Sequence, residues 1–196
     1  MDYYLNHTLS TAVQHIDPSR KLIVEFGVHS GASIRMLRNM LDPSFKVWGL
    51  DTFTGLPEDW SGTDLKVGMF DMGGKPPEFP IDHGEITFFI GLFSASLPQM
   101  LQERVFDGEK IGLVHVDCDL YSSTMDIFRY IGHLFDAGTI IVFDEWTYNF
   151  DPMCDDHEQR AFKEWIAKFG KKYEFIDVGP NTSRADRERK AVRIIA

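Results

Sequence analysis

Residues 22–33 constrain the fold of this chain more than any other stretch. An apolar run at 22–24 is followed at once by an acid, Glu25, and then by two glycines, Gly27 and Gly31. An amphipathic pattern begins at Ser33. This order predicts a buried parallel strand, a tight glycine turn and the start of a helix. In dinucleotide-binding folds such a turn brings backbone N–H groups close to the ligand.

The spacing within this turn argues against a dinucleotide. A dinucleotide fingerprint reads Gly-x-Gly-x-x-Gly, and His29 stands where its second glycine would be. An acid at the strand tip would repel a pyrophosphate, whereas Glu25 suits a ligand with a positive end, such as the ammonium group of a methionine moiety. The alternative is an ordinary strand–turn–helix with two turn glycines.

Length, net charge and cysteine content limit what kind of protein this chain can be. The 196 residues fit one domain, residues 1–196, with room for an inserted lid. The net charge of −10 argues against nucleic acid and anionic membranes as partners, because both attract basic faces. Two cysteines make no disulfide framework. We find no signal-peptide pattern and no apolar run of about 18 residues, so we expect a cytoplasmic protein.

Strand and helix patterns alternate along the chain, which predicts an α/β fold with a Rossmann-like, doubly wound parallel sheet and helices on both faces. Residues 1–17 hold an N-terminal helix, and residues 59–84, rich in Gly, Pro and Asp, form a lid or insert loop. The loop between the last two strand patterns is too short for a crossover helix, so we expect these strands to pair antiparallel. Further strands are expected at 46–51, 85–90, 111–117, 139–144, 173–178 and 191–195, and helices at 30–41, from 96, at 122–137 and at 157–169. On the helix at 30–41, Arg35, Arg38 and Asn39 are expected to face outward.

Acids follow successive strand patterns, at the edge of the sheet where ligands bind in such folds. At the second strand tip, Asp51 fits an acceptor for ribose hydroxyls, with a cap or turn residue as the alternative. Asp117 and Asp119 follow the fourth strand, and Asp144 and Glu145 the fifth. Like charges gathered in one crevice repel unless a cation compensates, and carboxylate oxygens suit Mg²⁺, Mn²⁺ or Ca²⁺. The alternative is that Asp119 and Glu145 cap the helices that follow.

With these residues in view, the chain resembles the class I S-adenosylmethionine-dependent methyltransferases, and more narrowly the macrocin and mycinamicin type of macrolide-sugar O-methyltransferase. The matching stretches occur in the family's order. They read Glu-Phe-Gly-Val-His-Ser-Gly-Ala-Ser at 25–33, Gly-Leu-Asp-Thr-Phe-Thr-Gly-Leu-Pro-Glu at 49–58, Gly-Leu-Phe-Ser-Ala-Ser-Leu-Pro at 91–98, His-Val-Asp-Cys-Asp-Leu-Tyr-Ser-Ser-Thr at 115–124 and Ile-Ile-Val-Phe-Asp-Glu at 140–145.

The resemblance implies a seven-stranded sheet with an antiparallel last strand, S-adenosylmethionine as cofactor and a divalent cation, usually Mg²⁺. It places the methionine end of the cofactor at the glycine turn, the ribose at Asp51 and the adenine near Phe93. The metal ligands that it implies are Asp117, Asp144 and Glu145, where the family usually has Asp at the last position. The cofactor-binding residues are Glu25, Gly27, Val28, His29, Ser30, Gly31, Asp51, Thr52, Phe53, Phe93, Ser94 and Asp117.

The expected reaction is methyl transfer to a hydroxyl of a small molecule, with Asp117 and Asp144 in the catalytic group and the cation as Lewis acid and template. His157 and His29 are the candidate general bases, and His115, inside a strand, is expected to be a core residue. The acceptor stays open between a sugar hydroxyl, a catechol-like diol and another natural-product-like compound. The N-terminal helix allows a homodimer.

Three other functions compete with methyl transfer. Asp117-Cys-Asp119 could hold a metal and a nucleotide sugar in a glycosyltransferase, although the glycine turn at Glu25 would then be unexplained. A nicotinamide oxidoreductase conflicts with His29 in the turn. A non-catalytic protein that binds S-adenosylmethionine could keep every one of these residues and lack turnover.

Overall fold

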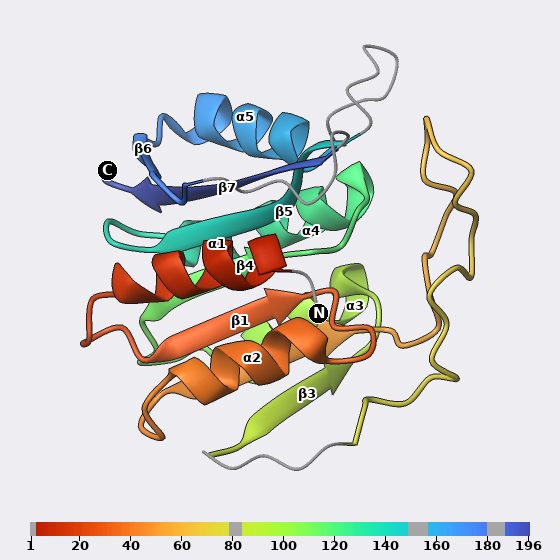
Figure 1. The fold of residues 1–196 in the computed structure, drawn as a ribbon, viewed down its shortest axis with the longest axis horizontal. Coiled ribbons are helices and arrows are strands. Elements are labelled where there is room, and N and C mark those ends of the chain that lie inside the picture. The colour runs from red at the N-terminus through yellow and green to blue at the C-terminus, as the bar shows by residue number, and fades with distance from the viewer. Residues whose placement is uncertain (1–2, 79–83, 149–156, 180–186) are drawn as a thin grey trace.

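The alternating strands and helices fold into one seven-stranded sheet covered on both faces (Figure 1). The structure is a computed structural model that describes residues 3–78, 84–148, 157–179 and 187–196. The strands lie in the order β3-β2-β1-β4-β5-β7-β6. Their bounds are β1 Leu22–Phe26, β2 Lys46–Asp51, β3 Ile86–Ile90, β4 Ile111–Val116, β5 Ile140–Tyr148, β6 Tyr173–Ile176 and β7 Arg187–Ile194.

The first five strands are parallel, and β7 runs antiparallel to both of its neighbours, β5 and β6. The predicted doubly wound sheet with an antiparallel last strand is therefore confirmed. The strand order reverses between β1 and β4, and ligands in open α/β sheets bind at such a switch point, beyond the carboxyl ends of the strands.

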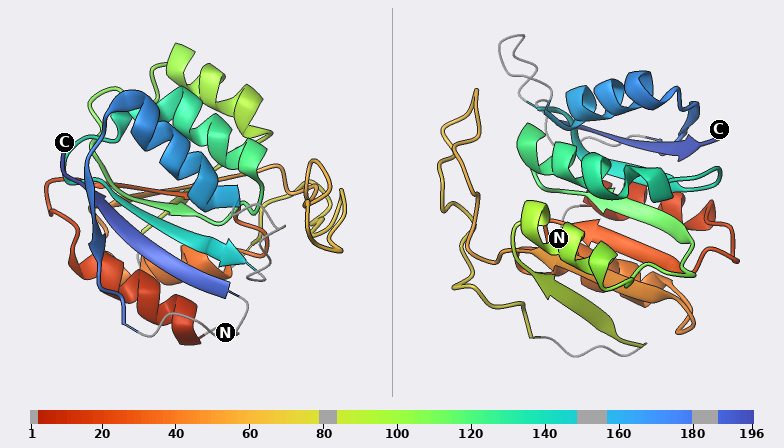
Figure 2. Two further views of the ribbon diagram at one scale, coloured as in Figure 1. Left: turned by 90° about the horizontal axis from the view of Figure 1, so that it is seen from above. Right: turned by 180° about the vertical axis from the view of Figure 1, so that it is seen from behind.

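Helices cover the sheet in two outer layers (Figure 2). Helices α1 (Tyr3–Gln14) and α2 (Ala32–Met40) pack on one face, and α3 (Phe93–Gln102), α4 (Tyr121–Ile131) and α5 (His157–Phe169) on the other. A short 3₁₀ turn, Gly132–Leu134, follows α4. Aromatic rings fill the face of the sheet that α3, α4 and α5 cover, where Phe128 of α4 stacks on Trp165 of α5 with ring centroids 4.8 Å apart. No helix in these described ranges is long and apolar enough to cross a membrane.

Three local expectations were wrong in their bounds or direction. Helix α3 begins at Phe93, before the expected residue 96, and α4 gives way to the 3₁₀ turn at Gly132 instead of running to residue 137. Arg38, expected to face outward, is fully buried. Its guanidinium donates to the carbonyl oxygens of Phe45 at 2.6 Å, Leu41 at 3.0 Å and Asp42 at 2.6 Å, so it satisfies carbonyls beyond the end of α2.

Strand β5 is longer than predicted, and this changes the place of two functional candidates. Its pairing with β4 ends at Phe143, but β7 pairs with it again at Thr147 and Tyr148 after a shift of register. Asp144 and Glu145 therefore lie at an irregularity inside β5, not beyond its end. A bulge of this kind re-aims side chains, and bulges are common beside active sites.

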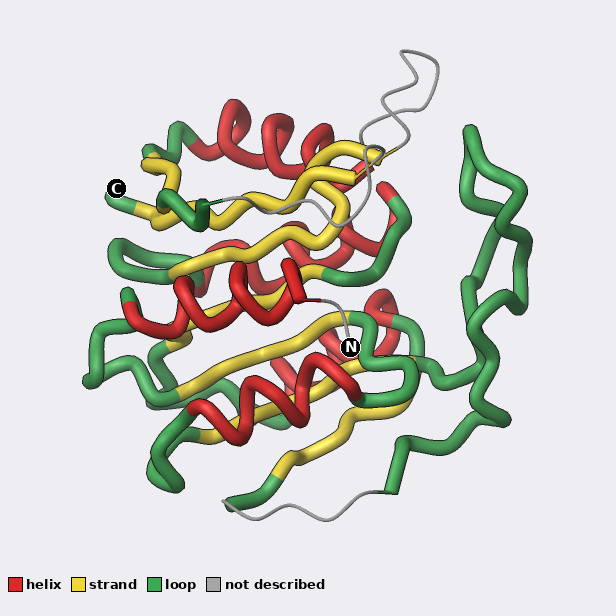
Figure 3. The backbone as a smooth tube through the Cα atoms, in the orientation of Figure 1, coloured by secondary structure: helices red, strands yellow, loops and turns green. Residues whose placement is uncertain are grey.

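The segment between β2 and β3 forms a long excursion away from the sheet (Figure 3). Its first half packs through a small apolar cluster of Leu56, Trp60 and Leu120. One isolated antiparallel bridge joins Thr54 to Asp71. The interpretation of residues 59–84 as a lid stays a prediction, and residues 79–83 lie outside the described ranges.

Candidate active site

A cavity of about 310 Å³ opens at the carboxyl ends of the central strands. This volume lies at the lower end of the range of about 300–1,000 Å³ that is typical of small-molecule sites. Its wall combines the glycine turn, the start of α3, the loop after β4 and the irregular part of β5. The lining residues are Leu5, Gly27, His29, Asp51, Thr52, Gly55, Leu56, Pro57, Phe70, Leu92, Phe93, Asp117, Cys118, Asp119, Ser123, Asp144, Glu145 and Arg189.

The glycine turn is held in place by Asp51. One carboxylate oxygen of Asp51 accepts from the backbone N–H groups of Val28 and His29, both at 2.8 Å, and the other accepts from the N–H of Phe53 at 2.8 Å. The first two amides of the turn therefore bind protein, contrary to the expectation that they face the ligand. Gly27 has φ of 86°, and a Cβ there would lie 1.8 Å from the carbonyl oxygen of Asp117. Only glycine lets β1 and β4 end this close together.

Glu25 lies beneath the cavity and not in its wall. It is fully buried and accepts from Ser33 Oγ at 2.9 Å, and its other oxygen lies 2.8 Å from His115 Nδ1. Burial raises the pKa of Glu25. Burial alone would lower the pKa of His115, but the hydrogen bond and the charge of Glu25 outweigh it and raise that pKa. His115 is thus a buried residue paired within the sheet, as expected.

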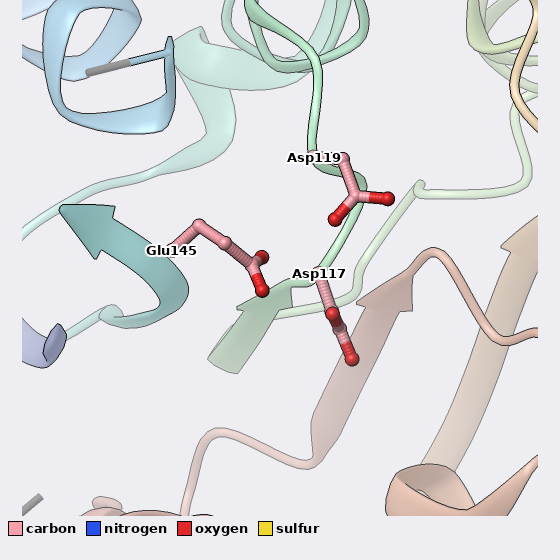
Figure 4. Close-up of side chains that lie close together, drawn as sticks. All are labelled: Asp117, Asp119 and Glu145. Carbon is pink, nitrogen blue, oxygen red and sulfur yellow. The ribbon is translucent and has the colours of Figure 1, made fainter. Parts of the chain in front are cut away.

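Three carboxylates, two from the loop after β4 and one from the irregular part of β5, converge on the cavity (Figure 4). Asp117 follows β4, Asp119 lies two residues further along the loop, and Glu145 projects from β5; one oxygen of each lies within 4.8 Å of the others. Asp119 adopts φ of 65°, a left-handed conformation that is uncommon for a residue other than glycine. Its backbone is therefore strained at the point where its side chain joins the other two.

A fourth acid, Glu158 at the start of α5, is fully buried beside this group and accepts from the backbone N–H of Glu145 at 3.1 Å. Burial, and then the charge of Asp144, raise the pKa of Asp117 well above its usual range. Burial and the charges of Asp117 and Asp144 do the same to the pKa of Glu158. Excess negative charge is therefore concentrated here, and a cation would relieve it.

Asp144 does not belong to the group of three, because it forms a buried ion pair with Arg189 of β7. The Nε atom of Arg189 donates to one carboxylate oxygen, and its Nη2 lies 3.4 Å from the other. The two side chains are 1% and 3% exposed. The structure thus brings Asp117 and Glu145 together with Asp119, while Asp144, the third ligand implied by the resemblance, is held by an arginine.

Comparison with known protein families shows to which family the chain belongs. Residues 6–166 match the family model described as Macrocin-O-methyltransferase (TylF). The chain belongs to the macrocin O-methyltransferase family. It is therefore an O-methyltransferase, as the sequence predicted, and the glycosyltransferase and oxidoreductase alternatives fall away.

Solved structures agree with the family's fold. The calicheamicin methyltransferase CalS11 is 19% identical, with a TM-score of 0.69 over 95% of this chain and 77% of its own. The O-methyltransferase NovP is 19% identical, with a TM-score of 0.65 over 98% of this chain and 78% of its own. An O-methyltransferase from Bacillus cereus, solved with S-adenosylhomocysteine, is 13% identical, with a TM-score of 0.56 over 98% and 80% of the two chains. A comparison with curated protein sequences found no match.

The residues that the macrocin O-methyltransferase resemblance assigned to the cofactor divide into two groups. Half line the cavity: Gly27, His29, Asp51, Thr52, Phe93 and Asp117. Glu25, Val28, Ser30, Gly31, Phe53 and Ser94 are not in its wall. At least Val28 and Phe53 act through the backbone, since their amides orient Asp51.

His157, a candidate general base, has both ring nitrogens engaged. Its Nδ1 accepts from the backbone N–H of Tyr121 at 3.1 Å, and its Nε2 lies 3.2 Å from the carbonyl oxygen of Ser61. The ring therefore joins the start of α4 to the loop after β2, and it does not line the cavity. His29, the other candidate, is in the cavity wall and lies edge-on to Phe70, with ring centroids 5.7 Å apart.

Glu158 and Arg189 lie at the site but were not predicted from the sequence, although the sequence holds a signal for Glu158. Glu158 lies three, four and seven residues before Ala161, Phe162 and Trp165, on the buried face of α5. An acid on an apolar helical stripe is a signal of a buried carboxylate. The sequence predicts the last strand only from residue 191, so it does not point to Arg189, which belongs to β7 through the pairing of that strand with β5.

Proposed function

We propose that this enzyme transfers the methyl group of S-adenosylmethionine to a hydroxyl group of a sugar or another natural-product-like small molecule, assisted by a divalent cation. One observation carries the proposal: a single cavity joins the glycine turn and Asp51 to the carboxylates of Asp117, Asp119 and Glu145. A cofactor bound along the turn would present its methyl group toward those carboxylates. The acceptor hydroxyl would have to lie between the two.

The cofactor fits the wall beside the glycine turn. Asp51 would accept from one ribose hydroxyl, because its two carboxylate oxygens have four lone pairs in total and backbone N–H groups take three of them. Only one further acceptor site is left by this count, so we expect one direct ribose hydrogen bond. Phe93 and Leu92 at the start of α3 offer apolar surface for the adenine.

The donor set fits a hard cation such as Mg²⁺, because carboxylate oxygens from three side chains lie within reach of one another and no described cysteine or histidine belongs to the group. We propose Asp117, Asp119 and Glu145 as its ligands, with Asp119 in the place expected for Asp144. When bound, the cation would supply Lewis acidity and fix the position of the acceptor hydroxyl. Arg189 would hold Asp144 away from the metal.

Methyl transfer also requires a general base that accepts the proton of the acceptor hydroxyl. We propose His29 for this role, because it lines the cavity, whereas both nitrogens of His157 are bound to backbone groups. A general base must lie within hydrogen-bond reach of the proton that it removes. His29→Asn should lower kcat with little change in the affinity for S-adenosylhomocysteine.

Calorimetry tests the cofactor and the metal separately. S-adenosylhomocysteine should bind wild-type protein, and NADH should not. Mg²⁺ affinity should fall at least tenfold in Asp119→Asn and should be within about threefold of wild type in Asp107→Asn, a control at an exposed acid beyond α3. Failure of S-adenosylhomocysteine to bind would overturn the proposed cofactor site. Unchanged Mg²⁺ affinity in Asp119→Asn would remove Asp119 from the ligand set.

A further inference from the structure

Glu158 is a buried carboxyl group that the proposed reaction does not yet use. It lies in the first turn of α5, is fully buried and does not line the cavity. One of its oxygens accepts from the backbone N–H of Glu145 at 3.1 Å, and the other, Oε1, has no hydrogen-bond partner among the described residues. A buried carboxyl oxygen without a partner lowers stability, so folding alone does not explain this residue.

The hydrogen bond from Glu145 to Glu158 is made where β5 leaves the regular sheet. Pairing of β5 with β4 ends at Phe143, and its register with β7 passes directly from Phe143 to Thr147. Residues 144–146 therefore stand opposite Arg189 alone. A bulge of this kind takes backbone groups out of the strand ladder. Glu158 supplies an acceptor for the N–H of the middle residue of the bulge.

Helix α5 holds Glu158 at a fixed place beside this bulge. The side chain of Gln159 donates to the carbonyl oxygen of Trp146 at 3.4 Å. The ring of Phe162, one turn further along α5, lies 5.2 Å from that of Phe143 and 5.7 Å from that of Trp146, measured between centroids. The start of α5 is thus packed against β5 on both sides of the bulge, and the acceptor oxygen moves only if the helix moves.

The backbone of Glu145 decides where its carboxylate points. Its side chain projects from β5 toward Asp117 and Asp119, and one oxygen of each of the three lies within 4.8 Å of the others (Figure 4). Asp117 and Asp119 both come from the loop after β4, so Glu145 is the member of the group that a different strand supplies. Groups that orient metal ligands in this way influence metal affinity although they do not touch the ion.

We propose that Glu158 is a positioning residue of the metal site: by accepting from the N–H of Glu145 it holds the bulge of β5 so that the Glu145 carboxylate faces Asp117 and Asp119. This inference rests on the proposed function and adds to it a residue outside the cavity wall. Glu158 acts through the hydrogen bond that it accepts and not through its charge, and this distinction can be tested by substitution.

Calorimetric titration of Mg²⁺ into Glu158→Gln and Glu158→Met makes the test. Both replacements are uncharged, and only glutamine keeps an oxygen that can accept from the N–H of Glu145. We expect Glu158→Met to bind Mg²⁺ at least about tenfold more weakly than Glu158→Gln. Glu158→Ala, which lacks an acceptor and adds no bulk, should also bind more weakly than Glu158→Gln. The control pair Glu164→Gln and Glu164→Met, at a position of the same helix that is 44% exposed, should show no difference.

A second comparison uses Glu145→Ala as the background, where no carboxylate is left to be positioned. There the difference between Glu158→Gln and Glu158→Met should disappear, and a difference that persists would overturn the inference.

Equal Mg²⁺ affinity of the glutamine variant and of the variants without an acceptor would also overturn it, provided that each compared protein gives the wild-type circular dichroism spectrum. A role limited to folding would change the free energy of unfolding and leave the Mg²⁺ affinity of the folded protein unaltered. If Glu158→Met does not give that spectrum, the comparison is made between Glu158→Gln and Glu158→Ala. Failure of the wild-type protein to bind Mg²⁺ would instead refute the proposed metal site, so the two failures are distinguishable.

Discussion

The buried pair of Arg189 and Asp144 leads to our most specific prediction about stability. Removing one partner from a buried ion pair leaves the other charge uncompensated and typically costs about 3–5 kcal/mol. In this site the two removals are not equivalent. Arg189→Met takes the guanidinium from a region that holds Asp117, Glu145 and Glu158 as well as Asp144. We expect it to cost the full amount.

Asp144→Asn should cost less, for two reasons. Asparagine keeps one oxygen that can accept from the guanidinium. The substitution also removes the negative charge of residue 144, which raises the pKa of both Asp117 and Glu158. The repulsion between that charge and these two carboxylates is therefore lost. We expect a cost of about 1–2 kcal/mol for Asp144→Asn, against about 3–5 kcal/mol for Arg189→Met. For a chain of this size the latter corresponds to a fall in Tm of about 10 °C.

Urea unfolding followed by circular dichroism, with EDTA present, measures both free energies of unfolding. The control is Arg193→Met in the same strand, whose partner Glu174 lies 2.8 Å away with side-chain exposures of 31% and 52%. An exposed pair of this kind contributes about 0–1 kcal/mol. The reasoning is refuted if Asp144→Asn destabilises the protein as much as Arg189→Met, or if Arg189→Met costs no more than the control.

Three further outcomes follow from the site. The native pKa values of Asp117 and Glu158 are raised above the usual 3.8 and 4.5, so the folded state holds more protons than the unfolded state above that range. Stability in EDTA should therefore fall as pH rises above the usual 4.5, and a Tm that does not fall as pH rises from this value would contradict it. Gly27→Ala should lower the free energy of unfolding, measured in urea, by at least about 3 kcal/mol, because the added Cβ would clash with the backbone of Asp117. Gly108→Ala is the control: Gly108 has a similar φ but open space around it, and the substitution should cost about 1 kcal/mol. Equal costs would argue against the close approach of Gly27 to Asp117. His157→Ala should lower Tm and leave the pH–rate profile unchanged in shape, and an altered profile would restore it as a base candidate.

Much of the fold could be predicted because its signals are local. The apolar run at 22–24 and the turn glycines marked β1 and the start of α2, and the same alternation located β2, β3 and β4. The antiparallel pairing of the tail followed from the short loop between its two strands. The end of β5 could not be predicted, because the deciding contact was distant in sequence: β5 extends to Tyr148 because β7 pairs with it there.

The sequence by itself determined which acids stand near the carboxyl ends of the strands, since each follows a strand that its own apolar pattern defines. It could not determine which of them face one another. That depended on the left-handed backbone of Asp119, on the bulge at Asp144 and Glu145, and on an arginine brought alongside by an antiparallel strand. A carboxylate's role is set by the charges within a few ångströms of it, and only the tertiary structure brings Arg189 that close to Asp144.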